Sequence, residues 1–423
     1  MKVGIVGAGI GGLSLALMLH QRGIAAELWE STSEIKPLGV GINLLPHATK
    51  ELTELGLLAE LSALGIQTSS LTYYNKHGQL IWREPRGLLA GYPWPQFSLH
   101  RGALQMLLLA AVKARLGPDA VQCGQRAESF ENTAHGARVW LRQKQGGALQ
   151  MREVDVLVAA DGIRSALRSQ LYSDERDPLR YSGRVLWRGC THGSPYADGR
   201  SMFMAGYPDQ KFVAYPISAA AHARGDSQIN WIAELCVPEA PDNDWNRRVD
   251  KSVFAGAFAS WKWGWIDVPA LIEQTEDVYE FPLVDKDPLP RWTFGQFTLL
   301  GDAAHPLYPI GSNGSAQAIL DARCLADCLR GAKDVNYALR EYEAERLPKT
   351  AALLLRNRMN GPEQVMQMAE ERAPQGFASV DDVIARHELE EVSMRYKKLA
   401  GFDVQSLQAQ AAAHAAAGAS RSA

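Results

Sequence analysis

The sequence has few cysteines, no long apolar run and almost no excess of charge. Its five cysteines are odd in number and scattered over 423 residues, which argues against the disulfide framework of a small secreted protein. Cys324 and Cys328 are four residues apart on a predicted helix, but a zinc site would need further Cys or His ligands near them. We therefore expect buried thiols and no metal.

Membrane and nucleic-acid partners are also not expected. The apolar run Leu13–Leu19 is too short to span a bilayer and follows a glycine-rich turn rather than a basic leader. A net charge of -3 provides no positive field for a polyanion. These features predict a cytoplasmic protein, and they leave both a monomer and a homodimer open.

The beginning of the chain has the pattern of a βαβ unit. We expect a strand at 2–6, a helix at 11–22 and a second strand at 25–29. Short apolar runs at 154–159 and 297–300 end directly in Asp-Gly or Gly-Asp pairs, as buried central strands do. The sequence therefore predicts an α/β fold in which remote segments share one parallel sheet.

The turn between the first strand and helix has the spacing of a dinucleotide-binding loop. Gly7 allows a tight turn, Gly9 allows backbone to approach a pyrophosphate, and Gly12 allows close packing of helix on strand. Glu30 ends the second strand, where a carboxylate can accept hydrogen bonds from ribose hydroxyls. Only one such fingerprint occurs, so a second nucleotide would have no Rossmann site of its own.

Two further motifs follow in the chain and carry a family resemblance. Residues 161–168 read Asp-Gly-Ile-Arg-Ser-Ala-Leu-Arg, and residues 301–305 read Gly-Asp-Ala-Ala-His, followed by Pro309, Gly311 and Gly314. In this order, with the glycine turn, they resemble the flavoprotein aromatic hydroxylases of the p-hydroxybenzoate hydroxylase type. Stretches at 37–43, 100–105, 187–189 and 213–218 are most similar to the salicylate hydroxylase-like and phenazine-modifying branch.

The resemblance implies an activity and a domain plan. It implies FAD as cofactor, NADH or NADPH as transient co-substrate, and O2, with a flavin C4a-hydroperoxide hydroxylating a small aromatic or heteroaromatic acid or phenol, with or without loss of a carboxylate. We expect a discontinuous Rossmann-like FAD-binding domain with an inserted mixed or antiparallel substrate sheet. The expected ranges are 1–70, 100–180 and 290–350 for the FAD domain, 71–99 and 181–289 for the substrate domain, 351–402 for C-terminal helices and 403–423 for a flexible Ala-rich tail.

The same resemblance assigns the cofactor-binding residues. Asp302 would bind the FAD ribityl chain, Arg101 the pyrophosphate or ribityl region, and Asp161 the nicotinamide or pyrophosphate side. The loop from Pro309 to Gly314 would lie beside the flavin ring. The full expected set is Gly7, Gly9, Ile10, Gly11, Gly12, Glu30, Ser31, Gly41, Arg101, Gln105, Asp161, Gly162, Asp302, Pro309, Gly311, Ser312, Asn313 and Gly314.

The substrate pocket should be dry and aromatic, because water would divert the oxidant. Tyr215 and Trp187 are candidates for its wall, although both also suit an ordinary sheet core. Arg188 or His47 could anchor a carboxylate or phenolate. For Arg188 a surface salt bridge is the favoured alternative. Together with Pro309 these side chains form the candidate catalytic set of Tyr215, His47, Arg188 and Pro309, whereas His305 fits a structural role better than acid–base work.

Other functions stay open at this point. Trp261-Lys262-Trp263-Gly264-Trp265-Ile266 invites comparison with flavin halogenases, but Ile and Pro are not at the offsets of their W-x-W-x-I-P pattern, so we interpret these tryptophans as packing. A turnover-deficient flavin-binding protein is a second alternative. A dehydrogenase or Baeyer–Villiger enzyme is a third, and the single dinucleotide fingerprint argues against it.

Overall fold

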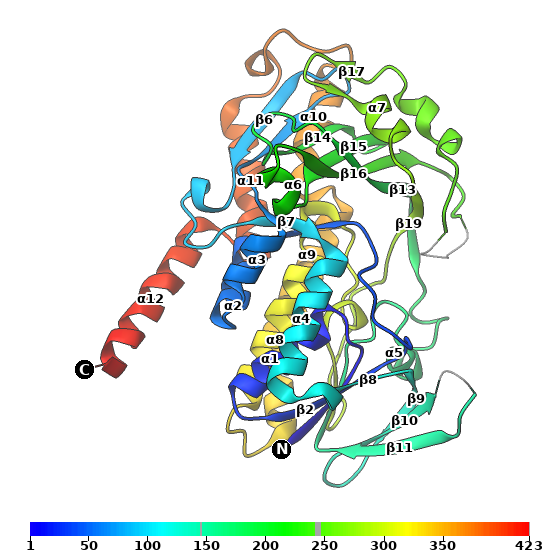
Figure 1. Ribbon diagram of the computed structural model, residues 1–423, viewed down its shortest axis with the longest axis vertical. Helices are drawn as coiled ribbons and strands as arrows, with labels where there is room; N and C mark the ends of the chain where they lie inside the picture. The colour runs from blue at the N-terminus through cyan, green and yellow to red at the C-terminus, as the bar shows by residue number, and fades with distance from the viewer. Residues whose placement is uncertain (144–145, 242–246, 423) are drawn as a thin grey trace.

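The structure is a computed structural model that describes residues 1–143, 146–241 and 247–422, the last nine of these by their backbone alone. Figure 1 shows a large sheet at one end of the molecule and a smaller group of strands at the other, with long helices between them. No helix within the described ranges is long and apolar enough to cross a membrane.

A five-stranded parallel sheet forms the nucleotide-binding end, as the sequence predicts. Its order is β20 (Phe297–Leu299), β12 (Val156–Ala159), β1 (Lys2–Val6), β2 (Ala25–Glu30) and β8 (Val121–Cys123). Val3, Ile5 and Val158 are fully buried in it, which accounts for the near-continuous apolar runs of these strands. The loops after β1, β12 and β20 therefore meet at one edge of the sheet.

Helices cover this sheet and hold the loops in place. They are α1 (Ile10–Gln21), α4 (Arg101–Leu116), α8 (Gly314–Leu329) and α9 (Val335–Arg358), with the shorter α2 (Pro46–Glu54), α3 (Leu58–Leu64) and α5 (Ala166–Leu171). An antiparallel group of β9 (Gln125–Asn132), β10 (Ala137–Gln143) and β11 (Leu149–Val154) lies beside the sheet. Val154 thus ends β11, and the predicted strand at 154–159 begins two residues later than expected.

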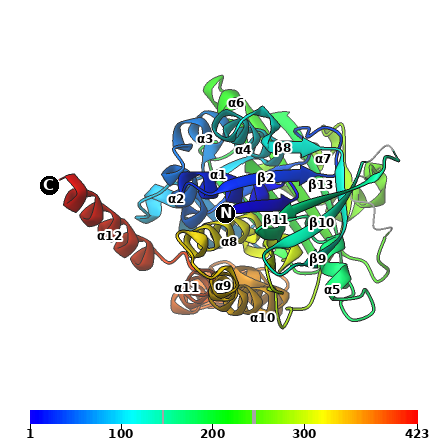
Figure 2. The ribbon, with the colours of Figure 1, turned by 90° about the horizontal axis from the view of Figure 1, so that it is seen from below.

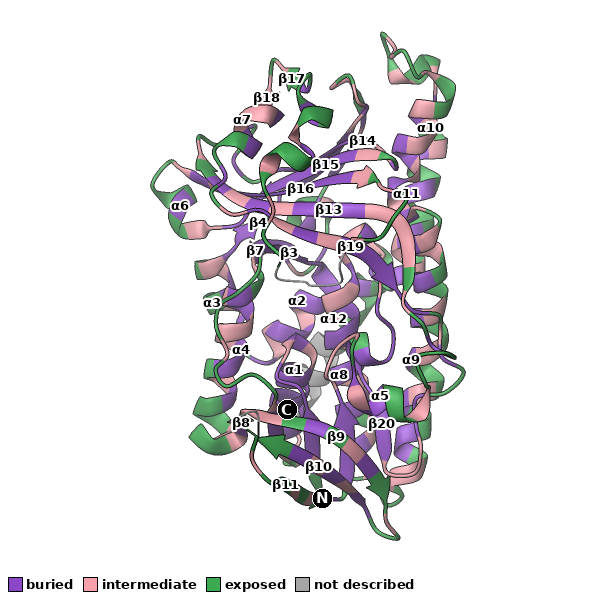
Figure 3. Cartoon of the chain, turned by 90° about the vertical axis from the view of Figure 1, so that its right-hand side faces the viewer, coloured by how far each residue is buried: buried purple, intermediate pink, exposed green. Residues whose placement is uncertain are grey.

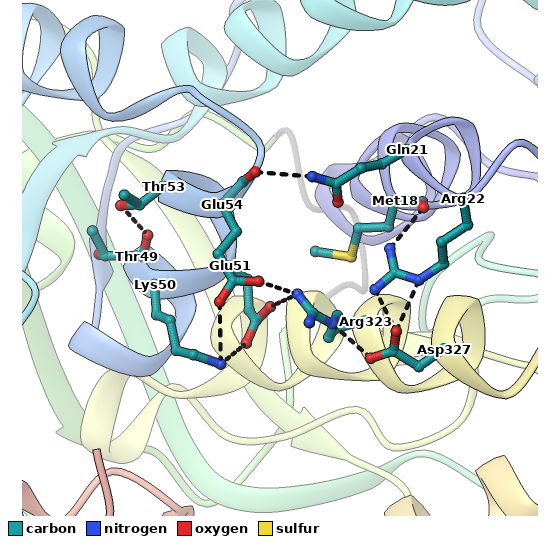
Figure 4. Close-up of polar contacts among 10 residues, drawn as sticks. All are labelled: Met18, Gln21, Arg22, Thr49, Lys50, Glu51, Thr53, Glu54, Arg323 and Asp327. Atoms are coloured by element: carbon teal, nitrogen blue, oxygen red, sulfur yellow. Dashed lines mark hydrogen bonds and ion pairs between the residues drawn. The ribbon is translucent and has the colours of Figure 1, made fainter. Parts of the chain in front are cut away.

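An ion-pair network joins α1, α2 and α8 (Figure 4). Arg323 of α8 contacts Glu54 and lies 2.9 Å from Glu51 and 2.6 Å from Asp327. Arg22, just after α1, donates to the same Asp327 at 2.8 Å. The network therefore holds the C-terminal ends of α1 and α8 together and joins both helices to α2.

The large sheet has seven strands in the order β19 (Tyr279–Asp285), β13 (Arg180–Gly193), β16 (Ser227–Cys236), β15 (Gln210–Pro216), β14 (Met202–Tyr207), β5 (Ser70–Tyr74) and β6 (Leu80–Pro85). All neighbours are antiparallel except β14 and β5. Buried residues run along these strands (Figure 3). The predicted mixed or antiparallel substrate sheet is therefore present.

One face of this sheet carries an aromatic core. Phe212, Trp231, Phe258 and Trp261 are buried there, beside α7 (Val268–Glu273) and the short strands β17 (Lys262–Trp263) and β18 (Ile266–Asp267). Trp265 stacks on Tyr74 with ring centroids 4.2 Å apart. The tryptophan-rich segment is thus packing, as expected.

The remaining elements link the two ends. β3 (Gly41–Leu44), β7 (Phe97–His100) and β4 (Ile66–Gln67) form a small antiparallel sheet. β7 therefore does not join the large sheet, although most of it lies within the segment 71–99. α6 (Ala219–Ala223) precedes β16, and α10 (Gln364–Arg372) and α11 (Arg386–Ala400) follow α9.

The end of the chain forms a helix. α12 (Val404–Ser422) is helical and projects from the body (Figure 2). Leu407 in its first turns is buried beside Tyr92, Tyr396 and Phe402. This apolar contact, which the Ala-rich composition does not reveal, fixes the beginning of the helix. Residue 423 lies outside the described residues.

Candidate functional site

The turn after β1 has the geometry of a nucleotide-binding loop. Gly7 has a φ of 102°, and a Cβ there would lie 2.4 Å from the carbonyl oxygen of Ala160. A Cβ on Gly12 would lie 2.1 Å from the carbonyl oxygen of Gly7, whereas one on Gly9 would meet nothing within 4 Å. The roles predicted for the three glycines therefore agree with the geometry: a turn, an open backbone and close packing.

Glu30 stabilises this turn from the end of β2. Its carboxylate accepts hydrogen bonds from the backbone N–H of Ala8 at 2.9 Å, the N–H of Thr32 at 2.8 Å and the hydroxyl of Ser31 at 3.1 Å. Gln105 of α4 donates to the Ala8 carbonyl at 2.9 Å. The acid at the strand end is thus held in place while still facing the adjacent cavity.

Two cavities meet at the edge of the parallel sheet. The first, of about 470 Å³, includes Glu30, Ser31, Gln105 and Asp161 in its lining. The second, of about 320 Å³, extends to the large sheet. Both include Gly9, Arg101, Ala160 and Gly162, so they form one elongated groove. Such a groove suits a dinucleotide lying across the glycine turn, with one end near Glu30 and the other near the large sheet.

Asp161 follows β12 and has an unsatisfied carboxylate oxygen. Its Oδ2 accepts from the N–H of Ala166 at 3.2 Å, while its buried Oδ1 has no hydrogen-bond partner among the described residues. Burial raises the pKa of the carboxyl to about 6, although hydrogen bonds from Ser165 and nearby amides act in the opposite direction. A buried, unpaired oxygen beside a cavity indicates a ligand position.

Arg168, the last residue of the second motif, is completely buried rather than on a helix surface. It contacts Asp177 through two bonds of 2.6 and 2.7 Å and donates to the carbonyls of Ala303 and Ala304, each at 3.0 Å. The structure shows that it joins the second motif to the third.

The third motif forms a tight turn after β20. Asp302 lines the 320 Å³ cavity, where protein surrounds it on the other sides. The resulting desolvation raises the pKa of its carboxyl, and the charges of His305 and Arg101 partly offset this rise. His305 points elsewhere: its Nε2 lies 2.5 Å from Asp321, whose other oxygen accepts from Arg346 at 2.7 Å. Although burial favours the neutral acid, these two partners hold the pKa of Asp321 at about 2.

This arrangement agrees with the structural role expected for His305. Its side chain is 3% exposed and does not line the groove. The N–H of Gly301 also donates to Asp321 at 3.1 Å. The histidine thus supports the turn that presents Asp302.

The loop Pro309–Gly314 ends at the N-terminus of α8 and lines the second cavity. Gly311 and Ser312 have φ values of 70° and 56°, the latter uncommon for a residue with a side chain. No side chain caps α8; the amide of Asn313 instead donates to the Tyr396 hydroxyl at 3.3 Å. The first amides of α8, at Gly314 and Ser315, therefore border the cavity with the positive end of the helix dipole.

The large sheet supplies the far wall of the second cavity through alternate residues. Tyr215 lies there, and burial raises the pKa of its hydroxyl to about 12, against the opposing effect of the Arg188 charge. Apolar side chains make up much of the surface between: Leu186, Met202, Met204, Val213 and Ile232. Tyr215 thus lines the cavity among these apolar side chains.

Arg188 also lines this cavity, so the surface salt bridge favoured from the sequence is wrong. It forms no ion pair with any of the residues that the structure describes. Its Nη2 donates to the carbonyl of Gly41 at 3.0 Å, and its buried Nε has no hydrogen-bond partner in the described ranges. Burial lowers its pKa, but an arginine remains charged in proteins, so a cation without a counterion borders the cavity.

Two other substrate candidates lie elsewhere. Trp187 points to the opposite face of the sheet from Arg188, where it donates to Glu280 at 3.0 Å and stacks on Phe254, because neighbouring strand residues alternate faces. His47 stacks on Phe402 with centroids 5.2 Å apart, lines neither cavity, and burial lowers its pKa to about 3. A neutral, enclosed imidazole does not provide the cationic anchor expected of it.

Sequence reasoning missed a buried charged group at the far end of the second cavity. Lys211 lies 2.8 Å from Glu234 and 2.7 Å from Glu363, with side chains 4%, 3% and 6% exposed. Lys211, Val213 and Tyr215 alternate along β15 and all face the cavity, so the period-two pattern carried a signal for Lys211. Its partner Glu363 is 152 residues away in sequence and had no such signal.

Comparison with known proteins places this geometry in a family. The profile of the FAD binding domain matches residues 1–357. The phenazine 1,6-dicarboxylic acid hydroxylase PhzS of Lysobacter antibioticus is 46% identical over 363 residues, covering 84% of this chain and 88% of that protein. The 3-amino-4-hydroxybenzoate 2-monooxygenase PtnB3 of Streptomyces platensis is 33% identical, covering 86% and 88%.

A solved structure resembles the whole chain. A variant of Klebsiella pneumoniae HpxO, complexed with FAD, has a TM-score of 0.71 and 25% identity, and the match covers 97% of each chain. The similarity therefore extends over the parallel sheet, the large sheet and the helices that follow them.

Proposed function

We propose that the substrate is an aromatic carboxylic acid anchored by Arg188. The premise is that the chain belongs to the FAD binding domain family and is an FAD-dependent monooxygenase of small aromatic compounds. One observation carries this proposal. Arg188 borders the cavity beside the apolar side chains of Leu186 and Ile232, and it has no carboxylate partner among the described residues. A buried cation in that setting is stabilised by an anionic ligand.

The groove fits FAD by criteria independent of the family. The groove runs past the open backbone at Gly9. Asp161, whose buried Oδ1 has no hydrogen-bond partner among the described residues, is one of the residues that line it. We assign Gly9 and Arg101 to the pyrophosphate, Glu30 to the adenosine ribose and Asp302 to the ribityl chain. The free N–H groups that begin α1 and α8 supply positive potential for the phosphates and for the electron-rich edge of the ring.

When bound, FAD accepts electrons from NADH or NADPH and delivers them to O2 for hydroxylation. The protein's part is to bind, orient and exclude water. Arg188 orients the acid through its guanidinium, Tyr215 contacts the ring, and Met202 and Met204 keep the surroundings apolar. Pro309 and the following loop lie on the side of the cavity that faces the flavin in this assignment. Excluding water favours transfer of oxygen to the ring over release of peroxide.

The test is a screen of aromatic acids for stimulated NAD(P)H oxidation, followed by the mass of the product. Phenazine carboxylic acids, benzoates and pyridine carboxylic acids are the first compounds, because the 46% identical relative is named for a phenazine acid. A supporting result is faster oxidation with an acid than with its uncharged amide, and a product heavier by one oxygen. Equal stimulation by acids and amides would contradict the anchor, and halide incorporation would replace hydroxylation by halogenation.

A further inference from the structure

The large-sheet end of the second cavity has two poles of different charge. Arg188 lies on β13 and has no carboxylate partner among the described residues. Lys211 lies on β15 with Glu234 and Glu363. Two-residue steps along a strand are about 6.6 Å, and the cross-strand pairs place Arg188 beside Ile232 and Lys211 beside Glu234. The two poles are therefore one two-residue step apart along the strands and two strands apart across the sheet.

The second pole differs from the first because its cation is already neutralised. Two carboxylates contact one ammonium, and Arg184, partly exposed, lies 3.7 Å from Glu234. Although burial acts against the charged amine, Glu234 and Glu363 raise the pKa of Lys211, so the group is an ion network with no net charge to offer. A second carboxylate of a ligand placed there would lose its hydration and approach two like charges.

We propose that Glu234 and Glu363 are specificity-determining residues that make the cavity select aromatic monoacids over diacids of the same ring system. The inference rests on the proposed anchoring of the acid at Arg188. One carboxylate of the substrate pairs with that arginine. The opposite edge of the ring system meets the network of Lys211, Glu234, Glu363 and Arg184, which has no net positive charge to pair with a second carboxylate, and this edge must therefore be uncharged.

The experiment measures ligand binding to the FAD-loaded enzyme from changes in flavin absorbance, without turnover. The probes are two matched pairs, benzoate with isophthalate and phenazine-1-carboxylate with phenazine-1,6-dicarboxylate. In the unchanged enzyme the monoacid of each pair should bind at least about tenfold more tightly, because the second carboxylate of the diacid would lose its hydration beside a network that offers no net positive charge.

Two variants test the residues separately. Glu363→Gln and Glu234→Gln each leave Lys211 one carboxylate and should reduce the preference for the monoacid toward unity. Because each variant retains one of the two ion pairs of Lys211, loss of folding in one leaves the other informative. Glu280→Gln is the matched control, because Glu280 is buried on the same sheet, contacts Trp187 and does not line the cavity. This variant should show the same preference for the monoacid as the unchanged enzyme.

The outcomes are distinguishable. Equal binding of monoacid and diacid in the unchanged enzyme, or an unchanged preference in both glutamine variants, would overturn the inference while leaving the anchor intact. Failure of all four acids to bind would overturn both the proposed anchor at Arg188 and the selectivity built on it.

Discussion

Replacing Arg168 by methionine should destabilise the protein and weaken its hold on FAD. The side chain forms two short bonds to Asp177 and two 3.0 Å bonds to the carbonyls of Ala303 and Ala304. Methionine retains much of the apolar volume but provides none of these donors. The substitution therefore removes the connection between the second and third motifs without leaving a large cavity.

The structure allows the size of this effect to be worked out. Breaking a buried ion pair costs about 3 to 5 kcal/mol when the remaining charge is left unpaired. Here Lys286 still lies 2.8 Å from Asp177, so the remaining acid keeps a partner, but two backbone carbonyls lose their donor at about 1 kcal/mol or more each. We expect the free energy of unfolding to fall by about 3 kcal/mol.

Urea unfolding of the FAD-loaded protein measures the loss, and titration of the apoprotein with FAD measures the effect on the turn that carries Asp302. The dissociation constant should rise at least about tenfold, equivalent to 1.4 kcal/mol. Arg176→Met, at an exposed position in the same region, is the control and should change stability by less than about 0.5 kcal/mol. A loss below about 1 kcal/mol for Arg168→Met would refute the reasoning.

Other positions in the site are open to equally direct tests. Glu30→Ala should weaken FAD binding by about 1 to 3 kcal/mol, and Glu30→Asp by less, in titrations of apoprotein; equal affinities would place Glu30 away from the ribose. Arg188→Met should raise the dissociation constant of the aromatic acid about tenfold or more while leaving FAD bound, and an unchanged constant would remove the anchor. Substrate should accelerate flavin reduction by NAD(P)H in stopped-flow absorbance, where a 100-fold effect needs about 2.7 kcal/mol of differential binding; equal rates with and without substrate would contradict gating. His47 has a pKa of about 3 in the folded protein, below its unfolded value of 6.5. Its contribution to the free energy of unfolding is therefore fully present above pH 6.5 and is lost as the pH falls toward 3, because protonation then favours the unfolded chain. His47→Phe should therefore reduce the drop in unfolding free energy between pH 7 and pH 5 by about 2 kcal/mol, and an identical drop in both proteins would show that His47 is not held neutral.

The parallel sheet was predictable because its signals are local. The bounds of β1 and the order strand, turn, helix, strand follow from apolar runs and the glycine spacing within 30 residues. Asp161 and Asp302 lie two and three residues after the ends of β12 and β20, at the sheet edge. The buried strands predict this position, whereas the family resemblance supplied the cofactor roles expected of the two residues.

The substrate wall was less predictable because it depends on which face of a strand meets the cavity. Trp187 and Arg188 are adjacent in sequence, yet one enters the aromatic core and the other the cavity. His47 follows β3 in the sequence, but α2 carries it into a buried contact with Phe402. Alternation along a strand predicts that neighbours diverge, and only the tertiary structure decides which of them faces the groove.

The distant hydrogen-bond partners of buried charged residues could not be predicted either, because they too depend on the tertiary structure. Arg168 contacts carbonyls 135 and 136 residues away, and the spacing of its motif gives no indication of them. Burial of an arginine is rare unless it is paired, and the carbonyls that accept from Arg168 are distant in the sequence. The sequence shows the motif that contains Arg168, and only the fold shows that it contacts the carbonyls of Ala303 and Ala304.

The most direct test of the central claim is a turnover experiment with isotopically labelled O2, an aromatic acid from the screen, NAD(P)H and the FAD-loaded protein. We expect that the acid accelerates NAD(P)H oxidation, that the product carries one labelled oxygen on its ring, and that Arg188→Met loses most of this product at low substrate concentration. Labelled peroxide with no oxygenated product, for every acid that binds, would contradict the assignment of this chain as an aromatic acid hydroxylase.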